Sequence, residues 1–389
     1  MNRRAALKQQ ILRHLLLHRR ATRPELVALT GTRAATVFAA IGELKEAGWV
    51  VEPERRGKST GRRAPGLEIS PNCVHTLGVQ LRSSGWVGVI LDGSGRVIGE
   101  CRAEAEFRGG LDGVKREILL LLQKLRDRAG DGWASVRGVG FALPERMSAE
   151  RGETARTGRV PVWRDADAVR YLEGVSGLPA GVWPERMVRT CWEYRKLTGE
   201  RSEGVFLLSA SDGCFEGGFI RNGEYFSGDS GRAMEIGHLT VDPAGPLCDC
   251  GRRGCLEAVA GPAALERRVA AARAAGVDLG GMPESFSMAA FAEFAGKNPV
   301  VRAIADELCR HLGCALGAAV TLLNPGRIVL SGEITLLGDL LSESLRRELE
   351  SRCSPEAVRK LRITSAQSAE TDPARGAAMM MREKLLLES

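Results

Sequence analysis

The feature that most restricts how this chain can fold is a sulfur-rich segment, residues 235–257 (EIGHLTVDPAGPLCDCGRRGCLE). It holds one histidine and three cysteines: His238, Cys248, Cys250 and Cys255. Three thiolates and one imidazole form a closed tetrahedral ligand set for zinc, because soft sulfur and imidazole nitrogen suit this borderline-soft ion. The segment therefore predicts one structural Zn²⁺ ion held by these four side chains.

Two other arrangements of the three thiols are alternatives to a metal site. Free cysteine is among the most buried residue types, so the thiols could belong to a core. However, three of them within residues 248–255, beside glycine and proline, make poor core material. A disulfide would leave one thiol over, and nothing else in the sequence suggests export. Metal binding is the interpretation that uses all four side chains.

Positive charge is concentrated at the N-terminus. Residues 1–72 carry 14 Lys and Arg against 6 Asp and Glu, a net charge of +8, whereas the rest of the chain has a net charge of −1. A basic segment on a near-neutral body is typical of a nucleic-acid-binding module, and the alternative is a solvated basic face. No apolar run approaches the roughly 20 residues of a membrane span. Charged residues interrupt the apolar N-terminal stretch, so we expect a cytoplasmic protein rather than an exported one.

The basic segment has the pattern of a winged helix-turn-helix. Apolar residues at helical spacing predict a first helix over residues 5–18. Thr22 and Glu25 form a capping box that opens a second helix, and Gly31 makes the turn to a third. The elements that follow are the end of the third helix at Ala47-Gly48, strands over residues 49–51 and 67–69, and a basic hairpin tip over residues 55–63. Two helices joined by a short glycine turn are a helix-turn-helix, and the hairpin is its wing.

In such a domain the third helix enters the major groove of DNA. Its predicted outward side chains are Arg33, Ala35, Thr36 and Ala39. Arginine reads guanine, while alanine and the threonine methyl contact the thymine methyl. The cations of the hairpin tip that we also expect to contact DNA are Arg55, Arg56, Lys58, Arg62 and Arg63, of which the last two suit a narrow minor groove. The sequence thus predicts a double-stranded DNA operator as a partner.

Strands and helices alternate beyond residue 72, which predicts an α/β fold. Strand patterns cover residues 77–81, 87–91, 97–98, 136–143, 205–208, 217–220 and 328–330. Helical patterns cover residues 114–128, 167–175, 262–275, 301–323, 338–350 and 376–387. We predict that residues 276–299 are loop-rich and irregular.

The sulfur-rich segment resembles the zinc signature of the ROK family, which groups repressors, open reading frames and sugar kinases. The resemblance lies in Glu-x-Gly-His from Glu235, Cys-x-Cys-Gly from Cys248, and Gly-Cys-x-Glu ending at Glu257. It implies a two-lobed, actin-like (ribonuclease-H-like) ATPase or sugar-kinase fold after the winged helix-turn-helix. The expected domains are the DNA-binding domain over residues 1–72 and a ROK domain over 73–389, with lobe I over about 73–190 plus a helix at about 375–389, and lobe II over about 191–374.

The motifs with which ROK kinases hold ATP are altered in this chain. The first phosphate loop of the family, Asp-x-Gly-Gly-Thr, corresponds to residues 80–84 (QLRSS), and the second, Gly-Thr-Gly-x-Gly-x-Gly, to residues 211–218 (SDGCFEGG). Cys214 and Glu216 replace glycines, and the catalytic aspartate falls on Glu185. Phosphoryl transfer needs loops whose backbone N–H groups bind the phosphates of ATP. Because both loops are altered here, we expect no enzymatic activity.

The sugar side of the resemblance is retained in Glu235, His238 and Glu257, since carboxylates accept pairs of hydroxyl donors well. The alternative is that both acids support the zinc ligands or lie on the surface.

We predict a repressor of carbohydrate genes with a sugar or sugar-phosphate effector, acting as a homodimer or dimer of dimers. The rivals are a ROK-type sugar kinase with a divergent nucleotide site, and a regulator whose effector is a protein or that has none.

Overall fold

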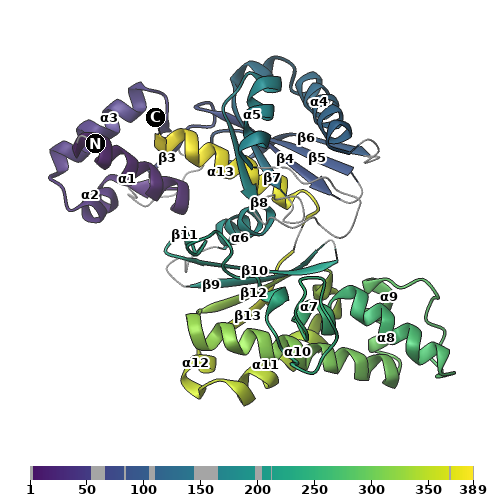
Figure 1. Ribbon diagram of the computed structural model, residues 1–389. Coiled ribbons are helices and arrows are strands. Elements are labelled where there is room, and N and C mark those ends of the chain that lie inside the picture. Colours follow the sequence, from purple (N-terminus) through teal and green to yellow (C-terminus); the bar gives the residue numbers. More distant parts are fainter. Residues whose placement is uncertain are drawn as a thin grey trace, which may run out of the picture. The chain divides into compact units, whose positions relative to one another are not determined.

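The computed structural model describes residues 3–53, 66–82, 85–104, 110–143, 165–197, 204–211, 213–367 and 369–388. Contacts divide the chain into two compact units, residues 1–188 with 370–389 and residues 189–369. The first unit holds an N-terminal head and a five-stranded sheet, and the second holds another five-stranded sheet (Figure 1). The α/β class predicted from the sequence is confirmed. The finer division into domains stays a prediction.

The described part of the head, residues 3–53 and 66–72, is a small helical domain with a three-stranded sheet. Its helices are α1 (Arg3–His18), α2 (Arg23–Thr30) and α3 (Ala34–Glu46). Its strands are β1 (Ala21–Thr22), β2 (Val50–Val51) and β3 (Gly66–Ile69), which pair antiparallel in the order β1-β3-β2. This arrangement agrees with the predicted winged helix-turn-helix. The hairpin tip lies within residues 54–65, outside the described residues.

Local capping signals set the start of α2 but not that of α3. Thr22 N donates to Glu25 Oε2 at 2.7 Å, and Glu25 N donates to Thr22 Oγ1 at 3.4 Å, which completes the capping box. Gly31 then takes a left-handed conformation with φ of 59°, as the turn requires. Arg33 at the start of α3 makes no side-chain capping bond. The predicted inward residues of α3, among them Val37, are buried.

The sheet of the first unit has the order β6-β5-β4-β7-β8. Its strands are β4 (His75–Arg82), β5 (Gly85–Leu91), β6 (Val97–Glu104), β7 (Val136–Leu143) and β8 (Ala180–Pro184). Its helices are α4 (Gly110–Ala129), α5 (Asp165–Ser176), α13 (Asp372–Glu388) and α6 (Glu185–Lys196), which contains the boundary between the units.

The two faces of this sheet carry different helices. Alternate residues of β4, including Leu77 and Val79, pack in one core with α4 and α5. On the other face, a Cβ on Gly78 would lie 1.8 Å from Ala374 O, so the glycine lets α13 lie directly against the strand. Thr76 Oγ1 donates to Ala378 O at 2.8 Å. Close packing thus fixes α13 on the sheet.

The far end of α13 packs into the head. Leu386 is only 3% exposed and belongs to the same hydrophobic core as Ile11 and Leu15 of α1. Gln9 Nε2 donates to Leu387 O at 2.6 Å. The last turn of the chain therefore completes the core of its first domain.

The sheet of the second unit has the order β11-β10-β9-β12-β13. Its strands are β9 (Val205–Ser211), β10 (Cys214–Arg221), β11 (Glu224–Tyr225), β12 (Arg327–Gly332) and β13 (Arg362–Ser365). Its helices include α7 (Leu256–Ala260), α8 (Pro262–Ala274), α10 (Pro299–Leu323), α11 (Gly338–Arg352) and α12 (Pro355–Arg359). No described helix is both long and apolar enough to cross a membrane.

Residues 276–287 are irregular, as predicted for the range 276–299, but the prediction is wrong for the residues that follow. They contain helix α9 (Met288–Ala295), whose N-cap Ser287 accepts a hydrogen bond from Ala290 N at 3.1 Å. Phe291 is fully buried in the core of the second unit. An eight-residue helix between glycine-rich turns has too few turns for a clear periodicity, and burial rather than propensity stabilises it.

Candidate metal centre and its surroundings

The four predicted metal ligands lie together in the second unit. Their donor atoms are all within 4.8 Å of one another. Cys250 Sγ and Cys255 Sγ are 3.5 Å apart, and Cys248 Sγ lies 3.7 Å from His238 Nδ1. Tetrahedral zinc with Zn–S bonds of about 2.3 Å places its sulfur atoms about 3.8 Å apart. The donor set and its spacing therefore fit a single metal ion of this kind.

The backbone of the loop brings these donors together. His238 closes the short helix η4 (Ile236–His238), and Cys255 directly precedes α7. Cys248 N donates to Arg252 O at 2.7 Å, which closes the tight turn between the thiols. At Gly254, with φ of 66°, a Cβ would lie 1.4 Å from Asp242 O, so only glycine fits. The glycines of the motif thus serve the fold of the loop.

The three thiols differ in how readily they ionise. Burial opposes ionisation of Cys250, but hydrogen bonds from Arg252, whose Nε lies 3.5 Å from the sulfur, and from the neighbouring thiols lower its pKa to about 7. Burial, with contributions from Cys250 and Cys248, raises the pKa of Cys255 to about 12, and burial also raises the pKa of Cys248. Since thiols bind metal as thiolates, metal binding would release their protons.

Glu257, a predicted sugar contact, joins two elements beside the cluster. Its Oε2 accepts a hydrogen bond from Phe215 N of β10 at 2.6 Å. A Cβ on Gly237 would lie 3.1 Å from the same oxygen, so the carboxylate lies against η4. This placement favours a supporting role for Glu257 in the metal loop, and it leaves a sugar contact as a proposal.

Glu235, the other predicted acid, lies at the start of η4 with its side chain only 15% exposed. It pairs with Arg232, whose Nε lies 3.1 Å from Oε1. Hydrogen bonding to Cys250 raises the pKa of Arg252, and the negative charge of Glu235 adds a smaller contribution. The two arginines were missed in the sequence analysis, although the spacing of three residues between Arg232 and Glu235 was a usable signal. Glu235, His238 and Glu257 thus gather around η4.

Two of the three glycines in the second phosphate-loop segment, Gly217 and Gly218, are needed for packing, whereas Gly213 meets no close neighbour and takes a left-handed conformation with φ of 80°. A Cβ on Gly217 would lie 2.6 Å from Met234 O, and one on Gly218 would lie 1.9 Å from Thr190 Oγ1. Cys214 pairs with Ser211 across the hairpin of β9 and β10, while Asp212 lies outside the described residues. Gly217 and Gly218 are therefore explained by the fold, and they do not argue for a phosphate site.

The two positions that correspond to kinase acids bond to each other. Gln80 Nε2 donates to Glu185 Oε1 at 3.1 Å, and the two residues are 2% and 4% exposed. Ser83 and Ser84 of the first phosphate-loop segment lie outside the described residues. Within the first unit, the carboxylate at the catalytic position is part of a buried polar pair.

The predicted DNA contacts on α3 are all exposed, namely Arg33, Ala35, Thr36 and Ala39. The predicted contacts on the hairpin tip, Arg55, Arg56, Lys58, Arg62 and Arg63, lie outside the described residues. Phe38 of the same helix, which was not among the predicted outward residues, is also exposed, at 46%. Its position next to Val37, a predicted inward residue, was a signal that Phe38 faces outward, because adjacent residues of a helix point in different directions.

Two five-stranded sheets, a His/Cys cluster beside one of them and a winged helix-turn-helix head define a two-lobed regulator-like architecture. The profile of the ROK family matches residues 111–384. The chain belongs to the ROK family.

Several regulators of the ROK family are similar to this protein over most of its length. The DNA-binding transcriptional dual regulator NagC of Escherichia coli K12 is 26% identical over 77% of this chain and 74% of its own length. The xylose repressor of Bacillus spizizenii is 23% identical over 97% of this chain and 94% of its own length. A crystal structure of a ROK family transcriptional regulator, a homologue of E. coli Mlc, shares the fold with a TM-score of 0.82. The match covers 99% of this chain and 97% of that chain, at 21% sequence identity. Glucokinases are also among the similar proteins.

Proposed function

We propose that this chain is a transcription regulator of the repressor type, which binds duplex DNA through its head and responds to a carbohydrate. The observation that carries the proposal is the combination of a complete helix-turn-helix with a buried Gln80–Glu185 pair at the kinase acid positions. The net charge of +8 over residues 1–72 supplies attraction to phosphates. The similarity to regulators over 77% and 97% of the chain supports the same assignment.

The proposal includes one zinc ion at His238, Cys248, Cys250 and Cys255, with a structural role. When bound, the ion would contribute folding free energy to the loop that carries Glu235 and Glu257. A sugar or sugar-phosphate effector would contact these acids and His238. We further propose a homodimer or dimer of dimers, since paired helix-turn-helix domains read palindromic sites about 34–36 Å apart.

The test of this proposal is a titration of sugars against a protein–DNA complex. Duplexes are first enriched from a random-sequence pool with the full chain, and glucose, xylose, N-acetylglucosamine and their phosphates are then titrated against the complex. We expect at least one of them to change DNA affinity by a factor of about 5–150, the usual range of allosteric coupling. Glu235→Ala should abolish this change, and Glu224→Ala, which removes an exposed acid from β11, should preserve it.

The outcomes separate the parts of the proposal. If no duplex is enriched, the assignment as a DNA-binding regulator is wrong. If a duplex is enriched but no sugar alters its affinity, the effector is not one of these sugars, and the acids around η4 are structural. A sugar that acts equally on the parent and Glu235→Ala binds elsewhere.

The second candidate function is sugar phosphorylation, which the glucokinase relatives favour. We expect no sugar-dependent ADP release in a coupled assay, because Gly217 and Gly218 are used in packing and Glu185 at the catalytic position is paired with Gln80. A ROK glucokinase in the same assay is the positive control. ADP release from this chain that requires a particular sugar would favour the kinase instead.

A further inference from the structure

The exposed face at the start of α3 is mostly apolar. The exposed residues there are Arg33, Ala34, Ala35, Thr36, Phe38 and Ala39. Most of these side chains are short, so only Arg33 and Phe38 extend far from the helix. Phe38 keeps 46% of its surface exposed on a helix that otherwise buries its large apolar residues. An aromatic ring is thus presented at the surface that a helix-turn-helix brings to the major groove.

A network of charged residues lies beside the ring of Phe38. Arg23 Cζ lies 6.0 Å from the ring centroid, within the range of a cation–π contact. Arg23 Nη2 is 2.5 Å from Glu52 Oε1, and Lys45 Nζ is 3.4 Å from the other oxygen of Glu52. Glu52, directly after β2, therefore positions Arg23 beside the ring.

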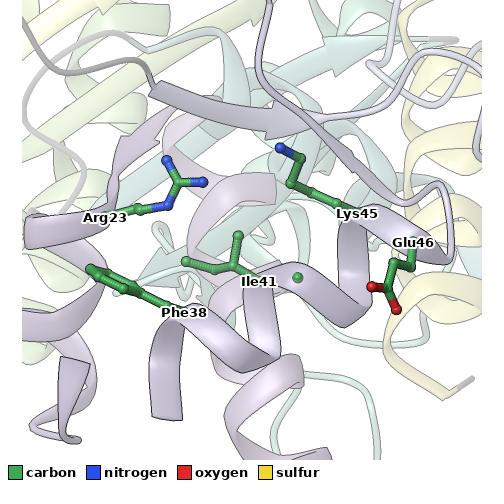
Figure 2. Close-up of a pocket in the computed structure, with 6 residues that line it drawn as sticks. Arg23, Phe38, Ile41, Lys45 and Glu46 are labelled. Carbon is green, nitrogen blue, oxygen red and sulfur yellow. The ribbon is translucent and has the colours of Figure 1, made fainter. Parts of the chain in front are cut away.

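A hollow of 490 Å³ opens beside the ring, lined by Arg23, Phe38, Ile41, Gly42, Lys45 and Glu46. Figure 2 shows Arg23 and Phe38 at one end and Lys45 and Glu46 at the other, with Ile41 between them. A Cβ on Gly42 would meet no described atom within 4 Å, so packing does not require glycine there. Glycine inside a helix is destabilising, but here it keeps the hollow open beside an aromatic ring.

Given that the head binds DNA, as proposed above, we infer that Phe38 is a specificity-determining residue that contacts the 5-methyl group of thymine. A phenyl ring has no hydrogen-bond donor or acceptor, so it cannot distinguish bases by hydrogen bonding. The thymine methyl is the apolar group that the major groove presents, and phenylalanine is among its known contacts. Ala35, one turn before Phe38, is short enough to let the helix approach the bases closely.

The experiment removes single methyl groups from DNA. Duplexes enriched from a random-sequence pool with the full chain are resynthesised with uracil in place of each thymine in turn, which deletes only the 5-methyl. We expect about fourfold weaker binding at one or more positions, because this is the loss of affinity when one buried carbon group is removed from the interface. Phe38→Ala should bind the thymine duplex more weakly and should bind thymine and uracil equally at those positions. Leu29→Ala, which truncates a 41% exposed side chain on α2, should keep the discrimination.

Each result decides between the inference and the proposed function. If uracil is tolerated at every position, or if Phe38→Ala retains the full penalty for uracil, the inference about Phe38 is wrong while DNA binding stands. If the parent chain enriches no duplex, the proposed function fails and the inference fails with it. Thermal unfolding of Phe38→Ala at the parent midpoint would confirm that the variant is folded, and Phe38→Leu, which keeps an apolar side chain, should retain part of the discrimination.

Discussion

Replacing Cys255 with serine is expected to remove one bound zinc per chain and to lower the unfolding midpoint of the protein by on the order of 10 °C. Cys255 is fully buried, directly precedes α7, and lies 3.5 Å from Cys250 Sγ. A ligand present at about a thousand times its dissociation constant stabilises the folded state by about 4 kcal/mol. For a unit of this size, each kcal/mol shifts the midpoint by about 2–4 °C. Metal analysis and calorimetry measure the two effects.

The control for this variant is Cys314→Ser on α10, a half-buried thiol outside the cluster. It should keep the metal and shift the midpoint little. The competing interpretation, that the thiols are only core residues, makes a different prediction. Under it, the parent protein would contain no zinc when purified without chelator, and Cys255→Ser would be destabilising without any change in metal content.

Local signals in the sequence predicted the parts of this protein whose structure depends on near neighbours. The Thr22–Glu25 capping box needs only three residues of chain, and it formed as predicted. The grouping of His238 with the three cysteines was also predictable, because the Pro and Gly residues between His238 and Cys248 favour a turn that brings the chain back. The fold class followed from the alternation of strands and helices together with the family resemblance of the metal loop.

Contacts between distant residues were not predictable in the same way. Helix α9 depends on burial of Phe291 in a core assembled from many segments. The bond from Phe215 N to Glu257 joins residues 42 positions apart, and it could not be inferred from either local pattern. The exposure of Phe38 could not be inferred from the sequence pattern, because large apolar side chains of an amphipathic helix usually face the core.

The docking of α13 on the head is another long-range contact, and it leads to the second large effect that we expect. Leu386→Ala should destabilise the head by about 2–5 kcal/mol, since truncating a buried leucine removes apolar contacts and leaves a cavity. Leu386 is 3% exposed in the core that contains Ile11 of α1. The apparent DNA affinity should fall in proportion to the fraction of molecules whose head is folded. Hydrogen exchange of α1 amides and DNA binding by the full chain measure the two consequences.

Two variants make this prediction specific to the packing of α13. Leu386→Met conserves volume and should retain most of the stability, whereas Leu322→Ala truncates a side chain that is 83% exposed on α10 and should change neither measurement. Unchanged exchange in α1 together with unchanged DNA affinity in Leu386→Ala would mean that the head folds without α13. If exchange increases and affinity falls together, the helix that lies against β4 through Gly78 also stabilises the DNA-binding core. A change in the sheet could then reach the head through this one helix, because α13 contacts both.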